Sequence, residues 1–251
     1  FSRAVGLADN FRMLVAGAIG QVFFPAFARL RDQGEPLGPA YLRVAAGYSA
    51  LIWPGMAGLA LAAGPLVRIL FGPGWSGVAP LLSAIALNDI MIMALPLHMD
   101  LPILLGRMNR LMTLNWLDTA LSMGTLVIGC QWGLEGAAIS RLVYGAGWLC
   151  LYARFMHGLV GFDLKALAAI YARSGCATLA ALTPLALAYA LWIPQETMGF
   201  VALAGLSASG VAMWLATLML LRHPVLDDLF GMAASLPGMR RFALRVRSQG
   251  A

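Results

Sequence analysis

Three long stretches of this chain carry no charged side chain, and this feature constrains the fold more than any other. No Asp, Glu, Lys or Arg occurs at 44–67, 174–195 or 197–221. Each stretch exceeds the roughly 20 residues that a helix needs to cross the hydrocarbon core of a bilayer. Because backbone polar groups in lipid must pair within the chain, these stretches are expected to be helical. The sequence therefore predicts an all-α, polytopic transmembrane helix bundle.

The composition excludes an ordinary soluble domain. Charged residues make up 11% of the chain and hydrophobic residues 61%, whereas a soluble domain carries about 25% charged residues. The net charge of +6 is explained by basic residues gathered in cytoplasmic loops, so no nucleic-acid partner is expected. Cys130, Cys150 and Cys176 lie in apolar stretches without metal-ligand spacing, so neither a disulfide framework nor a metal site is expected.

The apolar runs predict about seven spanning helices, of which the third is long enough to tilt or to kink at Pro96 or Pro102. The expected spans are 7–28, 44–64, 78–105, 111–131, 133–156, 170–194 and 199–221. Two further segments are expected outside the spans: 36–43 as a short amphipathic surface run, and 65–75 as a connection interrupted by Gly and Pro.

Basic residues follow every second span. They collect at 29–43, 106–110, 155–170 and 222–251, while the intervening connections hold only Arg68. This alternation predicts that the four basic segments, including the carboxy terminus, face the cytoplasm. The amino-terminal end then faces outward. The chain opens at Phe1 with FSRAVGLADNF, which is typical of the interior of a longer protein, so we expect a fragment.

The first span has one polar face. A helical wheel places Asp9, Asn10, Arg12 and Gln21 with small residues on one half and apolar residues on the other. Two interpretations stay open. Asp9 and Arg12, three residues apart, either only neutralise each other, or Arg12 lines a cavity and attracts an anionic group such as a pyrophosphate.

Other spans also carry polar groups, which in lipid usually face the bundle interior or a wet cavity. In the fourth span, Asn115 and Asp118 start a stripe that continues through Ser122, Thr125 and Gly129. The smaller members of the stripe are expected to pack against a neighbouring helix, whereas Asp118, together with Asn115, is a candidate proton or cation site.

The third and fifth spans add further ionisable groups. Asn88 and Asp89 lie near mid-depth, and Asp89 and Asp100 are expected on one face of the third span. Asp89 is a second candidate for ion or proton coupling. Arg141 is expected to pair structurally with one of these acids.

No catalytic constellation is found. The chain has no GxSxG, HExxH, P-loop or paired-cysteine motif, and its three histidines are scattered. We therefore expect no enzyme, no catalytic residue, no metal and no cofactor.

Several strings, taken together in their order and spacing, carry a family resemblance. They are FSRAVGL at 1–7, FPAFARLRDQGEPLGPAYLR at 24–43, WPGMAGLALAAGPLVRILFGPGW at 53–75, LLGRMNRL at 104–111 and GLEGAAIS at 133–140. In combination they resemble the carboxy-terminal half of Wzx-like oligosaccharide-lipid flippases, which belong to the multidrug/oligosaccharidyl-lipid/polysaccharide exporter superfamily. The resemblance covers roughly residues 1–160.

The resemblance implies half of a 12–14-helix, two-bundle transporter of the bacterial inner (plasma) membrane. The implied substrate is an undecaprenyl-pyrophosphate-linked oligosaccharide, which is a repeat unit of polysaccharide, O-antigen or exopolysaccharide. The implied mechanism is translocation across the membrane by alternating access. The other implied partners are membrane lipid, a glycan polymerase and export machinery. Arg12 and Arg3 would face the substrate. The resemblance also implies a division of the chain into four parts. Residues 1–64 would form the end of the cavity-lining bundle, with cytoplasmic loop 29–43, and residues 65–156 the remaining spans of the carboxy-terminal bundle. Residues 157–221 would form a terminal helix pair and residues 222–251 a basic cytoplasmic tail.

Two other functions remain open at this point. A cation-coupled exporter of drugs or metabolites would share the architecture and depend on Asp89 or Asp118. A membrane scaffold without transport activity would depend on packing residues and would tolerate changes to polar residues in the cavity.

Overall fold

The computed structural model describes residues 25–191, 194 and 197–226. Within these ranges the fold is entirely helical, which confirms the predicted polytopic helix bundle. The long helices are α2 (Gly38–Leu61), α4 (Ala79–Met93), α6 (Met108–Cys130), α7 (Gly133–Val160), α8 (Leu164–Leu191) and α9 (Phe200–Leu220). The short ones are α3 (Ala63–Phe71), the 3-10 helix η1 (Pro73–Val78) and α5 (Asp100–Leu104).

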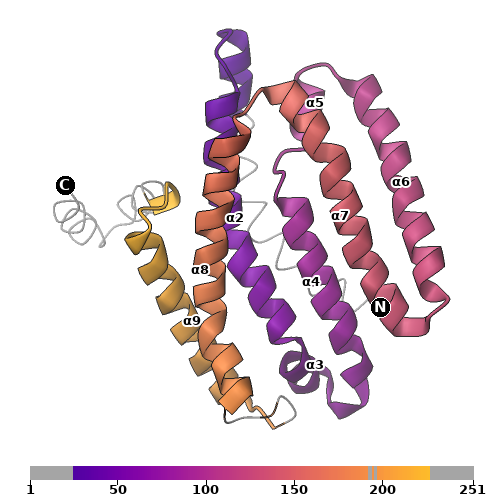
Figure 1. Ribbon diagram of the computed structural model, residues 1–251, viewed down its shortest axis with the longest axis vertical. Helices are drawn as coiled ribbons and strands as arrows, with labels where there is room; N and C mark the ends of the chain where they lie inside the picture. Colours follow the sequence, from indigo (N-terminus) through magenta and orange to yellow (C-terminus); the bar gives the residue numbers. More distant parts are fainter. Residues whose placement is uncertain (1–24, 192–193, 195–196, 227–251) are drawn as a thin grey trace.

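The long helices form an open row of neighbours. Figure 1 shows α9, α8, α2, α4, α7 and α6 in that order across the molecule, and each packs on the next. α2 is at the centre of the row, and 50% of the residues in its most apolar stretch are buried. In α6, at the edge of the row, the corresponding share is 6%. The spatial order therefore differs from the order in the chain, because α2 is flanked by α4 on one side and by the much later α8 on the other.

Among the described residues, five helical segments are long and apolar enough to cross a membrane. They are Gly38–Leu61, Pro73–Met93, Met108–Cys130, Leu164–Leu191 and Phe200–Leu220. They correspond to five of the predicted spans. α7 covers the predicted span 133–156 and is long enough, but it carries Glu135, Arg141 and Arg154 and is not among the five. The predicted span 7–28 falls almost wholly outside the described residues.

The third predicted span, 78–105, is wrong as a single helix. α4 ends at Met93, turns follow through Met99, and α5 starts at Asp100. Pro96 explains the break, since its ring clashes with the preceding turn and disfavours helical backbone at the residue before it. Leu97 then adopts a positive φ of 56°. The proline that was expected to kink the helix interrupts it.

Two connections are also shorter than predicted. Residues 25–32 are helical and α2 starts at Gly38, so the expected loop 29–43 shrinks to 33–37, and 38–43 belongs to the spanning helix. The expected irregular segment 65–75 is largely helical, because α3 runs to Phe71 before Gly72, at a φ of 88°, ends it. Gly72 has the left-handed conformation that glycine adopts without steric cost.

One end of the bundle gathers the basic segments. α2, α6 and α8 begin there and α7 ends there (Figure 1). The Arg31 Nη1 atom donates a 2.8 Å hydrogen bond to the Leu104 carbonyl, and a Cβ at Gly38 would lie 2.9 Å from the Gly161 carbonyl oxygen. The basic segments around 29–43, 106–110 and 155–170 are therefore close together in space.

Candidate functional site

The predicted cavity residues of the first span lie outside the described residues. This applies to Arg3, Asp9, Asn10, Arg12 and Gln21. Their assignment to a substrate cavity, and the pairing of Asp9, stay predictions.

Asn115 and Asp118 face α7 rather than the exposed side of α6. The Tyr152 hydroxyl donates a 2.9 Å hydrogen bond to Asn115 Oδ1, and the Tyr144 hydroxyl donates one of the same length to Asp118 Oδ1. Hydrogen bonds between helices in lipid stabilise their association by about 0.6 kcal/mol on average. The two tyrosines thus fix the orientation of both side chains, while the coupling role of either residue stays a prediction.

Gly129, at the end of the same stripe, lies at a close helix contact, whereas the packing role of Ser122 and Thr125 stays a prediction. A Cβ at Gly129 would lie 2.5 Å from the Ser140 Cβ, and one at Gly136 would lie 2.2 Å from the Gly129 carbonyl oxygen. α6 and α7 therefore approach so closely that only glycine fits at these two positions.

Arg141 lies over the ring of Tyr144, with its guanidinium carbon 4.8 Å from the ring centroid. This geometry is a cation–π contact. Because Tyr144 also donates to Asp118, its ring lies between a cation and a carboxylate. The Nε atom of Arg141 is buried and has no hydrogen-bond partner. The predicted pairing of Arg141 with an acid stays a prediction.

Asn88 and Asp89 lie buried in α4. They are 1% and 6% exposed, and neither the side-chain nitrogen nor the oxygen of Asn88 has a hydrogen-bond partner. A Cβ at Gly145 of α7 would lie 2.6 Å from Asn88 Oδ1, so any larger residue there would require the Asn88 side chain to move. An unpaired buried amide costs roughly 1–3 kcal/mol, which marks Asn88 as a position kept polar against stability.

Asp89 and Asp100 do not share a helix face, because the break after Met93 separates them. Asp100 is exposed at the start of α5. His98, in the break, lies with its ring edge toward Trp148 at a centroid distance of 4.8 Å. Asp89 alone therefore remains as a buried acid of the predicted third span.

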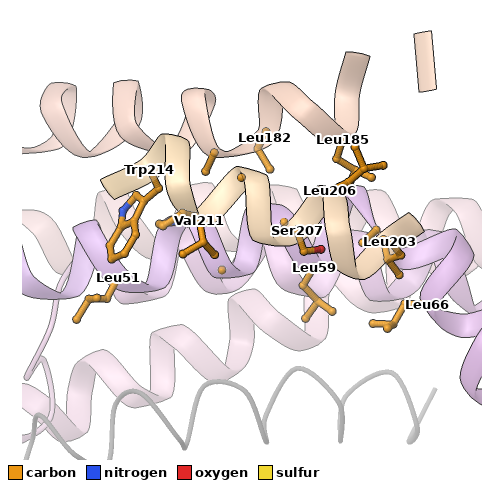
Figure 2. A pocket seen from close by; sticks show the side chains of 16 residues that line it. Leu51, Leu59, Leu66, Leu182, Leu185, Leu203, Leu206, Ser207, Val211 and Trp214 are labelled. Atoms are coloured by element: carbon orange, nitrogen blue, oxygen red, sulfur yellow. The ribbon is translucent and has the colours of Figure 1, made fainter. Parts of the chain in front are cut away.

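A long apolar groove runs between α2, α8 and α9. Its volume is about 470 Å³, and Figure 2 shows side chains from all three helices turned toward it. The residues that line it are Leu51, Pro54, Gly55, Gly58, Leu59, Ala62, Leu66, Ala181, Leu182, Leu185, Leu203, Leu206, Ser207, Gly210, Val211 and Trp214. None of them is charged, so the groove suits a hydrocarbon chain and offers no counter-ion to a polar ligand.

The sequence did not predict a buried hydrogen-bond network that joins α2, α8 and the segment after α9. Ser49 Oγ lies 2.8 Å from Ser174 Oγ, which lies 3.0 Å from His223 Nε2. The Val225 N–H donates to His223 Nδ1 at 3.3 Å, so Nε2 carries the proton of the neutral ring. All three side chains are at most 1% exposed. Such burial leaves no room for a substrate, so this Ser–His contact is structural.

Two members of this hydrogen-bond network could have been suspected from the sequence. Ser49 and Ser174 are polar residues inside stretches free of charge, and such residues commonly bond across helix interfaces in membranes. Nothing in the sequence, however, places His223 beside them.

No cluster of metal-ligating residues is present in the part of the chain that the structure describes: no three or more His, Cys, Asp or Glu side chains gather there. The three cysteines are free and exposed.

Comparison with protein families gives a match for the amino-terminal third of the chain. Residues 1–80 match the model of a family described as "Polysaccharide biosynthesis protein". This match supports the predicted family resemblance over residues 1–80. No curated protein and no solved structure matches the chain. The chain is thus a multi-pass membrane protein whose first 80 residues are similar to a polysaccharide biosynthesis protein family.

Proposed function

We propose that the chain is part of a transporter that turns lipid-linked oligosaccharide across the bacterial inner membrane by alternating access. The match of residues 1–80 to a polysaccharide biosynthesis family, on a bundle of membrane-spanning helices, carries this proposal. The implied substrate is a repeat unit of polysaccharide, O-antigen or exopolysaccharide on undecaprenyl pyrophosphate. A glycan polymerase and export machinery would take the product.

The groove between α2, α8 and α9 supports a substrate with a hydrocarbon chain. It is apolar along its length and carries no charge among its lining residues. A lipid-linked sugar also needs cationic contacts for its pyrophosphate, and Arg12 and Arg3 would supply them. The basic end of the bundle would face the cytoplasm, with the carboxy terminus on the same side.

The proposal is tested by glycan export in a strain that lacks the gene. The lipid-linked oligosaccharide on each face of the membrane is measured, and accumulation on the cytoplasmic face is expected. An unchanged pool with normal surface polysaccharide would contradict the proposal. In the complemented strain, Arg12→Ala is expected to abolish export while the protein still inserts.

A matched pair of glycine variants tests the groove. Gly58 lines it, and a Cβ there meets nothing within 4 Å, so Gly58→Leu fills the groove without a backbone clash. Gly47 lies on the same helix with equally open space but outside the groove. Gly58→Leu is expected to reduce export and Gly47→Leu to leave it unchanged. Equal export by both variants would remove the groove from the mechanism.

A cation-coupled exporter of drugs or metabolites is the second candidate. The observation that favours it is the carboxylate of Asp89, which is 6% exposed inside a spanning helix, since buried acids of this kind serve ion and proton relays. Asp89→Asn or Asp118→Asn would then abolish efflux, and deletion of the gene would leave glycan export intact.

A further inference from the structure

A basic pocket lies between the start of α6 and the last turns of α7, away from the apolar groove. Its volume is about 470 Å³. The residues that line it are Arg107, Arg110, Leu114, Leu151, Arg154, Phe155, Gly158 and Leu159. It lies at the end of the bundle where the basic segments gather.

Three arginines share this cavity without a balancing charge. The lining includes Arg107, Arg110 and Arg154 and no carboxylate. Within the described residues, none of the three side chains makes an ion pair or a hydrogen bond. Three guanidinium groups around one cavity repel one another, and an anion bound among them would relieve that repulsion.

The polar and apolar parts of the lining are separated by depth in the membrane. α6 starts at this end, so Leu114, four residues after Arg110, lies one turn deeper along the helix. α7 ends here, so Leu151, three residues before Arg154, also lies about one turn deeper. Cationic groups therefore form the outer rim and leucines form the floor, which is the arrangement that an amphiphile with an anionic head requires.

The backbone at the start of α6 has the same electrostatic preference. Arg107 precedes the helix without a side-chain capping bond, and the first turn holds no acidic residue. The N–H groups of that turn and the helix dipole therefore add positive potential beside the arginines.

We propose that this arginine pocket binds the phosphate headgroup of an anionic membrane lipid, with the lipid chains along Leu114 and Leu151. Guanidinium groups present a planar fork of donors that matches phosphate oxygens. Basic pockets between membrane helices near the interface bind such headgroups. The proposal is independent of transport and of which side of the membrane this end faces.

The apolar floor favours a lipid over a soluble anion. Inorganic phosphate would use the arginines alone and leave Leu114 and Leu151 without an apolar partner. A lipid places its chains against these leucines and its phosphate at the rim. The pyrophosphate of a lipid-linked sugar has the same chemistry, so the test must separate these sources.

The test is a binding titration on the full chain in zwitterionic detergent, read by native mass spectrometry. The probes are short-chain phosphatidylglycerol, phosphatidylcholine, polyprenyl pyrophosphate and inorganic phosphate. The wild-type chain is expected to bind phosphatidylglycerol and not phosphatidylcholine. Each basic residue near an anionic surface contributes about fivefold in affinity. The variant R107Q/R110Q/R154Q is therefore expected to lose about a hundredfold.

Two further variants separate binding from folding. Gly158 lines the pocket, and a Cβ there meets nothing within 4 Å, so Gly158→Trp fills the pocket while all charges stay. It is expected to lose binding as the arginine variant does. Arg43→Gln removes an exposed arginine from the same end of the bundle outside the pocket and is expected to bind as the wild type does.

The outcomes decide between the sources. Tighter binding of polyprenyl pyrophosphate than of phosphatidylglycerol, lost in both pocket variants, supports the pocket and identifies the lipid-linked carrier as its occupant. Inorganic phosphate that displaces phosphatidylglycerol at equal concentration overturns the lipid assignment. Unchanged phosphatidylglycerol binding in R107Q/R110Q/R154Q and Gly158→Trp overturns the pocket itself. None of these three results depends on whether the chain exports glycan.

Discussion

Two buried polar junctions of this bundle are built in opposite ways. Where α2 meets α8, Ser49, Ser174 and His223 form one hydrogen-bonded chain. Where α4 meets α7, both side-chain polar atoms of Asn88 have no hydrogen-bond partner among the described residues. All of these groups are removed from solvent, so burial alone does not explain the difference.

The difference separates polar groups that hold the fold together from polar groups that the fold tolerates. A satisfied buried network stabilises and specifies one packing, whereas a partly satisfied one costs free energy. Asn88 contributes no side-chain hydrogen bond to the described part of the fold, so its removal should not weaken the bundle. The following changes test this separation.

The largest effect is expected from His223→Ala. The substitution removes a side chain that is 1% exposed, leaves a cavity and takes away the partner of Ser174, so a loss of about 2–4 kcal/mol in the free energy of unfolding is expected. Unfolding in detergent measures it. His157→Ala, at an exposed position, is the control and should cost less than about 1 kcal/mol. Equal losses would end the structural assignment of His223.

The opposite sign is expected at the other junction. Asn88→Leu replaces unpaired polar atoms by an apolar side chain of similar size, so the free energy of unfolding should stay equal or rise by about 1–2 kcal/mol. Ser174→Ala should lower it by about 1 kcal/mol. Both are read in the same unfolding assay. Destabilisation by Asn88→Leu comparable to that of Ser174→Ala would mean that the two junctions do not differ.

The pH dependence of stability sharpens the assignment of His223. Burial, followed by the charge of Arg173, lowers the pKa of His223. The unfolded chain therefore binds a proton more readily than the folded one, and the stability from the neutral ring is complete above the unfolded value of about 6.5. It is lost as the pH falls toward the lowered pKa, since a proton on Nδ1 would face the Val225 N–H. Unfolding as a function of pH should show this dependence in the wild type and less of it in His223→Ala.

The smallest effect is expected between α6 and α7. Tyr144→Phe keeps the ring beneath Arg141 and removes the donor to Asp118, so a loss near 0.6 kcal/mol is expected. Tyr152→Phe removes a donor of the same length to the neutral Asn115 and is the matched control. A much larger loss for Tyr144→Phe alone would show that Asp118 is charged and depends on that donor.

The fold could be predicted from sequence wherever one physical term dominates. Long uncharged stretches have no alternative to helices in lipid, so the three helices over 44–67, 174–195 and 197–221 could be predicted directly. Pro96 was recognised as a disruption, but whether a proline kinks or ends a helix depends on what satisfies the freed backbone groups. α3 was missed because Gly72 and Pro73 suggested a loop, although the apolar residues before them are helical.

The site could be predicted less well, because it depends on which helices are neighbours. The close contact of Gly129 with Gly136 follows from small-residue spacing on adjacent helices. The contact of Ser174 with His223 and the unpaired amide of Asn88 depend on tertiary packing that no local pattern encodes. The residues on which the sequence based the substrate cavity, Arg12 above all, stay predictions.

The row of helices also has a consequence for how the protein is made. Helices leave the ribosome in chain order, so α2 meets α4 long before α8 exists. The Ser49 hydroxyl lies 2.8 Å from the Ala45 carbonyl of its own helix, so its proton has an acceptor on α2 itself before Ser174 of α8 is synthesised. The first helices can therefore enter the bilayer without leaving this donor unpaired, and α8 and α9 pack on α2 afterwards.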